Sequence, residues 1–134
     1  MKYIIMILFP LFIQGQNVDF SKLLERSTNN ITSCDSLMNF CINEDDPRKI
    51  AYLGAGLMLK SKYSRKLKYF KKGKNKLDDI INKYPNFVEL RWIRYCIQTN
   101  TPKILNYKQH LSEDKAMIQK NGNHNQKNIL KAYD

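Results

Sequence analysis

An Asp-Asp-Pro turn at residues 45–47 opens the stretch that most constrains the fold of this chain. Acidic residues and a proline are favoured at the N-terminus of a helix, so Asp45 and Asp46 are expected to cap a helix whose first position is Pro47. From Ile50 to Met58 no charged residue follows, which predicts a buried helix. Its small residues at positions 54 and 55 would let a neighbouring helix approach closely.

Apolar residues elsewhere recur at spacings of three and four, and strand patterns are nearly absent. This periodicity predicts an all-α fold, a small antiparallel array of helix hairpins. Asn86, with Glu89 three residues later, is expected to cap one helix, and Ser112 another. The helices are expected at residues 18–25, 33–42, 47–62, 65–83, 87–99 and 112–119, with a short turn at 101–105.

The first 16 residues have the order of a secretory signal peptide. Lys2 precedes an apolar run from Tyr3 to Ile13, and the polar sequence Gln-Gly-Gln follows. The run is shorter than the about 20 residues that cross a bilayer, and Pro10 interrupts it, so no retained transmembrane helix is expected. A retained anchor and a buried N-terminal helix are the alternatives. We therefore predict export, to the periplasm or the exterior.

The expected organisation has three parts. Residues 1–16 form the signal peptide, and residues 17–120 form one helical domain. The Asn-rich remainder, residues 121–134, is predicted to be a mobile tail because its composition is polar and rich in asparagine.

The formal net charge of +11 is unevenly placed along the chain. Acids predominate between residues 17 and 46, whereas the run from Lys60 to Lys76 contains no acid. Such a run can bind lipid headgroups or an acidic polysaccharide, a protein partner is the other expectation, and nucleic acid is an unlikely partner for an exported chain. The alternative is the solvated face of an amphipathic helix. The residues proposed to bind are Lys66, Lys68, Lys71, Lys72 and Lys76.

Arg91 and Arg94 are charged residues in an otherwise apolar helix, together with Glu89. Buried arginines commonly satisfy carbonyl groups or carboxylates, so a structural role is the first interpretation. If the protein binds a small anionic ligand, these two arginines are the candidates to hold it.

No catalytic constellation is found in the sequence, and neither a cofactor nor a metal site is expected. His110 and Asp114 have the spacing of a metal pair but lack a third ligand. Cys34 and Cys41 on one helix would lie about 10 Å apart, too far for a disulfide. Cys96, within an apolar helix, is expected to pack as a small hydrophobe.

The segment from Pro47 to Asn100 resembles a degenerate tetratricopeptide-type unit, with AYLGAGLMLKSKY in its first helix and a closing proline before the next. The run from residue 69 to 107, with the following SEDK, resembles a family of small exported helical proteins of Bacteroidetes. The resemblance covers about half of the chain and implies the fold and a bacterial envelope setting. It transfers no catalytic residue, because no activity is assigned to that family. The matching elements are Phe70 to Gly73, Ile80 to Pro85, Glu89, Arg91, Arg94, Pro102, Tyr107 and Asp114.

The expected function is therefore that of a non-catalytic exported helical interaction module, which binds a partner or an anionic surface through a basic helix face. One alternative is a structural subunit of a cell-envelope complex. The other is a thiol-dependent enzyme that uses Cys96.

Overall fold

The computed structural model describes residues 18–133, and the expected signal peptide lies outside them. Every regular element in this range is helical, which confirms the all-α class. No helix in this range is both long and apolar enough to cross a membrane. The elements are α1 (Phe20–Ser27), α2 (Ile31–Cys41), α3 (Pro47–Ser64), α4 (Leu67–Lys83), α5 (Val88–Asn100), the 3-10 turn η1 (Lys103–Leu105), α6 (Leu111–Asn121) and α7 (His124–Ala132).

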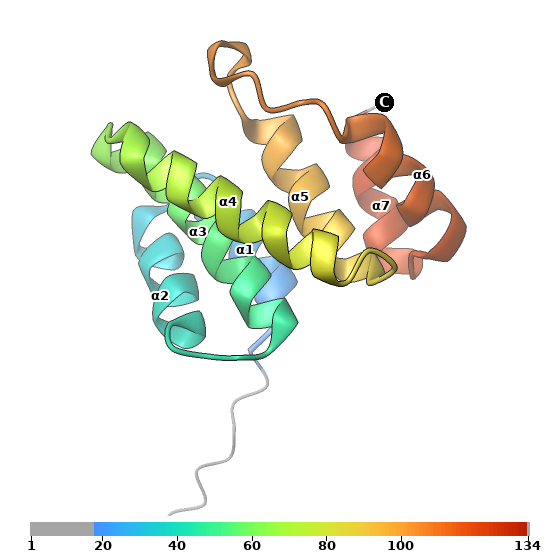
Figure 1. Cartoon of the computed structure of the whole chain (residues 1–134), viewed down its shortest axis with the longest axis horizontal. Helices are drawn as coiled ribbons and strands as arrows, with labels where there is room; N and C mark the ends of the chain where they lie inside the picture. Colours follow the sequence, from blue (N-terminus) through green and yellow to red (C-terminus); the bar gives the residue numbers. More distant parts are fainter. Residues whose placement is uncertain (1–17, 134) are drawn as a thin grey trace, which may run out of the picture.

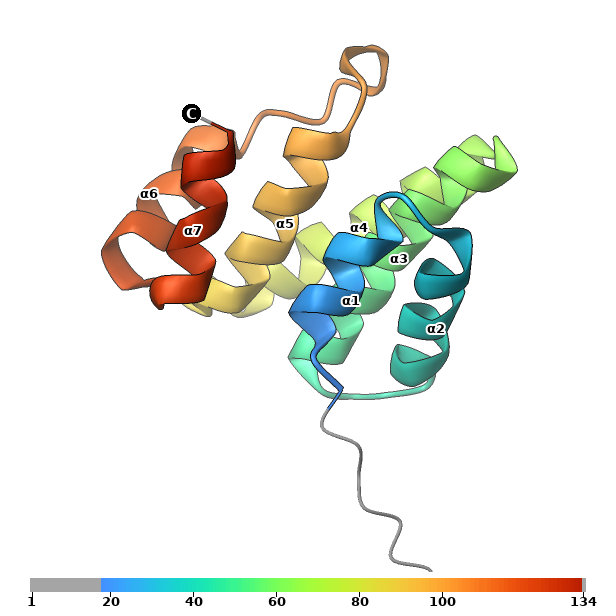
Figure 2. The ribbon, with the colours of Figure 1, turned by 180° about the vertical axis from the view of Figure 1, so that it is seen from behind.

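Helix α3 is the centre of the arrangement, because it contacts α1, α2, α4 and α5. Figure 1 shows α4 lying along α3, with α1 and α2 on the other side of α3. From α5 the chain continues through η1 to α6 and α7, which pack at the far end of the molecule from α2 (Figure 2).

The start of α3 confirms the expected cap. Asp46 is the N-cap residue, its carboxylate accepts a hydrogen bond of 2.8 Å from the Arg48 backbone N–H, and Pro47 occupies the first turn. The two preceding helices are capped in the same manner, by Asp19 and by Asn30. Local side-chain chemistry therefore fixes where the first three helices begin.

The glycines of α3 and α4 bring these two helices into close contact. A Cβ atom added at Gly54 would lie 2.9 Å from the Gly73 carbonyl oxygen and 3.1 Å from the Leu77 nitrogen. A Cβ atom added at Gly73 would lie 2.8 Å from the Met58 nitrogen. The expectation that small residues permit a close crossing is confirmed.

The spacing of apolar residues predicts inward-facing side chains on each helix, among them Leu37, Ile42, Leu67, Leu77 and Ile81, and two of these predictions are wrong. Leu37, Leu77 and Ile81 are buried as expected, whereas Ile42 and Leu67 are 55% and 49% exposed. Both exceptions lie at helix ends, Ile42 directly after α2 and Leu67 at the start of α4, where no neighbouring helix covers the predicted apolar side.

Two predicted caps are also wrong. Helix α5 begins at Val88 with Phe87 as its N-cap residue, and Asn86 provides no cap. Glu89 instead bonds to residues of α3. Helix α6 begins at Leu111, so Ser112 lies inside it, and the carboxylates of Glu113 and Asp114 in its first turn favour this start.

The Asn-rich segment at residues 121–134, expected to be a mobile tail, forms helix α7 over residues 124–132. Asn123 and Gln126 make a reciprocal capping box, with hydrogen bonds of 2.8 and 3.0 Å between each side chain and the other residue's backbone N–H. Leu130 is buried, and α7 contacts α5 and α6. The helical domain therefore extends beyond residue 120.

Candidate functional site

The predicted binding lysines gather on one side of α4. Lys68, Lys71 and Lys72 are exposed, Lys66 is the exposed N-cap residue, and Lys76 is partly exposed one turn further along. The buried residues of this helix, Phe70, Gly73, Leu77, Ile80 and Ile81, lie on its opposite side. We call Lys66, Lys68, Lys71, Lys72 and Lys76 the basic face.

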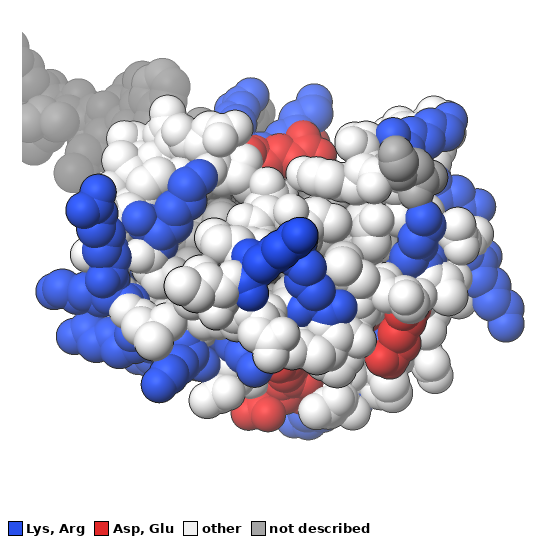
Figure 3. Space-filling view, turned by 90° about the horizontal axis from the view of Figure 1, so that it is seen from above, with Lys and Arg blue, Asp and Glu red and all other residues white. Residues whose placement is uncertain are grey.

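The basic face has no acidic partner among the described residues. The ion pairs of residues 18–133 involve Arg48, Lys49, Arg91, Arg94 and His110, and none involves a lysine between residues 60 and 76. Two lysines flank one aromatic ring instead: Lys60 lies 4.7 Å and Lys68 5.3 Å from the centre of the Tyr69 ring. Figure 3 shows a group of lysine and arginine side chains at the end of the molecule where α3 meets α4, with further cations spread over the rest of the view.

Arg94 lies inside the molecule and is paired with Asp114. Its Nε and Nη2 atoms donate to the two carboxylate oxygens of Asp114 at 2.7 and 2.8 Å, and the side chains are 2% and 0% exposed. Burial alone would lower the pKa of Arg94, but the hydrogen bonds and charge of Asp114 overcome this effect and raise it. The pair is therefore a bidentate ionic contact between α5 and α6.

Two further α5 side chains bind the same carboxylate. Gln98 donates from Nε2 to Asp114 at 2.9 Å, and its own carbonyl oxygen accepts from the His110 backbone N–H at 2.9 Å. Arg91 donates to Asp114 at 3.2 Å and to the Pro85 carbonyl oxygen at 3.0 and 3.1 Å. A hydrogen bond from Arg91 is also the largest cause that lowers the pKa of Glu113.

A second carboxylate, Asp78 of α4, extends this cluster. It accepts from the Tyr107 hydroxyl at 2.7 Å and from Arg94 Nη1 at 3.4 Å. Burial, followed by the nearby Asp78 charge, raises the pKa of Tyr107. Arg91 and Arg94, named from the sequence as possible ligand-binding residues, thus join α4, α5 and α6, which supports the structural interpretation.

Glu89 makes an equivalent contact between α3 and α5. It accepts from the Tyr52 hydroxyl at 2.9 Å and from Arg48 Nη2 at 3.1 Å. Tyr52 is fully buried, and burial followed by the Glu89 charge raises its pKa. The three charged residues of α5 therefore all serve helix packing.

The three cysteines are free thiols and all are buried. Burial raises the pKa of Cys34 and of Cys41 to about 11, and raises that of Cys96 well above its ordinary value. A nucleophilic cysteine needs the opposite environment, one that stabilises the thiolate. Burial of Cys96 therefore disfavours its thiolate form.

Metal-binding residues do not converge in the described part of the chain. Between residues 18 and 133, no group of three or more histidine, cysteine or acidic side chains is placed to hold an ion. His110 Nδ1 lies 3.5 Å from a carboxylate oxygen of Glu113, and the carboxylate of Asp114 is buried against the arginines of α5.

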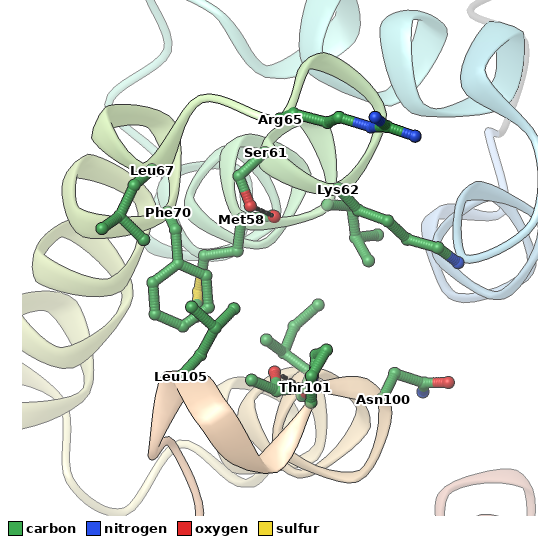
Figure 4. A pocket seen from close by; sticks show the side chains of 12 residues that line it. Met58, Ser61, Lys62, Arg65, Leu67, Phe70, Asn100, Thr101 and Leu105 are labelled. Atoms are coloured by element: carbon green, nitrogen blue, oxygen red, sulfur yellow. Dashed lines mark hydrogen bonds between the residues drawn. The ribbon is translucent and has the colours of Figure 1, made fainter.

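A pocket that the sequence did not reveal lies between the α3–α4 turn and the end of α5. It has a volume of about 410 Å³ and opens beside η1. Figure 4 shows Phe70 of α4 and Leu105 of η1 on its apolar side, with Lys62 and Arg65 across from them. The sequence gives little indication of this pocket. Arg65, where α3 ends, lies in the left-handed region with φ 56°, a conformation that is uncommon for arginine and is therefore not expected from the sequence.

Comparison of the chain with known protein families, with curated proteins and with solved structures finds no match.

Proposed function

We propose that this protein is an exported, non-catalytic helical interaction module that binds an anionic envelope surface through the basic face of α4. The observation that carries the proposal is a row of exposed lysines without an acidic partner among residues 18–133. The anionic chemistry is that of lipid headgroups or of an acidic polysaccharide.

The kind of cation supports a diffuse surface over a single bound anion. Arginine suits bidentate recognition of one phosphate or carboxylate, whereas lysine acts as a flexible point charge. Both arginines of α5 bind carboxylates inside the protein, and the basic face consists of lysines alone. Charges spread along a helix attract an extended anionic surface with little demand on geometry.

The test is a charge reversal with a matched control. Replacement of Lys68, Lys71 and Lys72 by glutamate should abolish retention on vesicles containing phosphatidylglycerol or on immobilised alginate. Wild-type retention should fade between low and physiological salt, because charges are screened within about 8–10 Å. Stability should change by less than about 0.5 kcal/mol per substitution, since the side chains are exposed.

The control variant replaces Lys108, Lys120 and Lys127, which are exposed outside α4, by glutamate. Its net charge equals that of the test variant, so its retention should stay close to wild type if the position of the charge matters. Equal loss in both variants would show that only net charge acts. If the wild-type protein binds neither the vesicles nor the alginate at low salt, the basic face is the solvated side of a helix and the proposal is refuted. Comparison of retention on vesicles with retention on alginate identifies which of the two surfaces is bound.

Export and envelope location belong to the same proposal and rest on residues 1–16. The mature chain is expected to begin near Gln16 or Asn17, because the polar residues after Ile13 offer the cleavage zone. N-terminal mass spectrometry of the protein from an exporting bacterium tests this. Met1 retained on envelope-associated protein would refute the signal peptide.

A tetratricopeptide-like arrangement of α3, α4 and α5 is proposed as the scaffold. It is supported by the glycine contact between α3 and α4 and by Pro85, which precedes α5. A structural subunit of an envelope complex would use the same scaffold. The two roles can be distinguished by purification. A structural subunit would still co-purify with its partner proteins at a fixed stoichiometry after the charge reversal.

A further inference from the structure

We infer that the pocket between the α3–α4 turn and η1 binds a fatty-acid anion, with the alkyl chain inside and the carboxylate at Lys62 and Arg65. This site is separate from the basic face, and neither depends on the other. Its volume of about 410 Å³ lies within the range of about 300–1,000 Å³ that is usual for small-molecule sites.

The walls of the pocket offer a ligand mainly apolar contacts, because the polar side chains among them already donate hydrogen bonds within the protein. Met58, Leu59, Phe70 and Ile97 are buried residues that line it. Its neutral polar groups donate their hydrogen bonds to their own helices. Ser61 donates to the Met58 carbonyl oxygen, Thr101 to that of Ile97 and Asn100 to that of Cys96, at 2.5, 2.6 and 2.7 Å.

Among the residues that line the pocket, Arg65 and Lys62 have hydrogen-bond donors that are available to a ligand. The guanidinium of Arg65 makes no hydrogen bond or ion pair with any residue between 18 and 133. Lys62 donates one hydrogen bond, to the Thr28 carbonyl oxygen at 2.7 Å, and has two further N–H groups. Figure 4 shows both side chains across the pocket from Phe70 and Leu105.

This combination selects the chemistry of the ligand. A neutral polar molecule would lose its water without finding free donors in the walls, whereas an alkyl chain gains from burial there. A carboxylate at the rim would complement the two cations. Apolar surface extends to the rim of the pocket, because the lining residue Leu67 is 49% exposed, and Ile104, the neighbour of the lining residue Leu105 in η1, is 90% exposed. A chain longer than the pocket can therefore remain in apolar contact.

The backbone at Arg65 offers a clean way to remove one cation. Its φ of 56° suits glycine better than any other residue. Arg65→Gly therefore deletes the guanidinium without a conformational cost. Ser61→Phe instead fills the open pocket from its wall. Lys127→Glu on α7 is the control, because it lowers the charge on a helix that contributes no residue to the pocket.

The experiment is calorimetric titration of the chain with octanoate, decanoate and dodecanoate below their micelle concentrations. Each methylene that enters the pocket should raise affinity about fourfold. Arg65→Gly should weaken decanoate binding by about tenfold or more, and decyltrimethylammonium, with the same chain and a cationic head, should bind more weakly than decanoate. Ser61→Phe should abolish binding, and Lys127→Glu should leave it unchanged, with thermal melts confirming that each variant is folded.

Affinity that is independent of chain length, equal binding of the cationic amphiphile, or binding that survives Ser61→Phe would overturn the inference, as would no binding at all. If the pocket instead seats a second copy of the chain, Ser61→Phe will change the mass measured by sedimentation and alkanoates will not bind. Vesicle and alginate retention by the Lys68, Lys71 and Lys72 variant is measured separately. The failure of one proposal is thus visible without the other.

Discussion

Removal of the Asp114 carboxylate is the most informative change that can be made to the core of this protein. Asp114→Ala leaves Arg94 Nε and Nη2 without an acceptor inside the molecule, and it removes one of the two acceptors of Arg91 Nη1 and of Gln98 Nε2. Arg94 is only 2% exposed, so water cannot replace the lost partner without local opening. Breaking a buried ion pair on one side costs about 3–5 kcal/mol.

That cost is a large fraction of the total stability of about 5–15 kcal/mol expected for a domain. It can be measured by urea unfolding, followed by circular dichroism and by the fluorescence of Trp92, the one tryptophan of the chain. Trp92 lies in α5 beside Arg91 and is 3% exposed, so its emission reports on the same helix. The midpoint should fall by about 1–3 M urea, with both signals changing together.

Glu113 provides the matched comparison. It also pairs with Arg91, but its side chain is 58% exposed and Arg91 keeps its contacts to Asp114 and Pro85. Glu113→Ala should therefore cost no more than about 1 kcal/mol. If the two alanine variants are equally stable, or if Asp114→Ala lies within about 1 kcal/mol of wild type, burial of the pair is not what makes it matter.

Three further outcomes are expected. Gly73→Ala should destabilise by about 1–3 kcal/mol in thermal or urea unfolding, because its Cβ meets backbone of α3, whereas Gly56→Ala, whose closest contact is with the flexible Met38 side chain, should cost less. The three cysteines should resist iodoacetamide near neutral pH and react in urea, since burial raises their pKa values; rapid native labelling would refute this. The pKa of Glu113 is lowered in the folded protein, so its contribution is present above about pH 4.5 and is lost as the pH falls through the lower value. Glu113→Gln should flatten that part of the stability–pH curve, and an unchanged curve would contradict it.

Features set by neighbours in the sequence could be predicted. The Asp46 cap and Pro47 fix the start of α3 through contacts within one turn. The glycines at 54 and 73 indicate a close helix contact, but they do not identify which helices make it. The order and approximate positions of α1 to α6 also follow from periodicity, whereas α7 was not predicted. One kind of failure arose where a local preference competes with a distant contact.

Glu89 illustrates this competition. Three residues after Asn86, it fits a capping box, yet its carboxylate bonds to Arg48 and Tyr52, which are 41 and 37 residues away. Two donors, one charged and one buried, stabilise it more than a single backbone N–H would. No spacing rule in the sequence identifies such partners.

The tail and the pocket were missed for a different reason. Asparagine-rich composition suggested a tail, but one capping box at Asn123 and one buried leucine, Leu130, are enough to place a short helix against α5 and α6. The pocket exists because α4 begins at Leu67 after a left-handed residue, Arg65, and this leaves the side of Leu67 uncovered. Both features depend on a few individual residues, whose effect is lost when a segment is judged by composition and periodicity.

The internal ion pairs contribute to the basic character of the α4 surface. Two acids are turned inward, because Asp78 of α4 bonds to Tyr107 and Arg94, and Asp114 bonds to three side chains of α5, whereas Asp79 of α4 is exposed. Buried arginines need these carboxylates, because an unpaired buried charge is costly. The fold therefore uses Asp78 and Asp114 to join α4, α5 and α6, and these two carboxylates are not available to the lysines of the basic face. Asp114→Ala and the lysine reversals accordingly test separate properties, since the first should alter stability and the second only the attraction of the surface for anions.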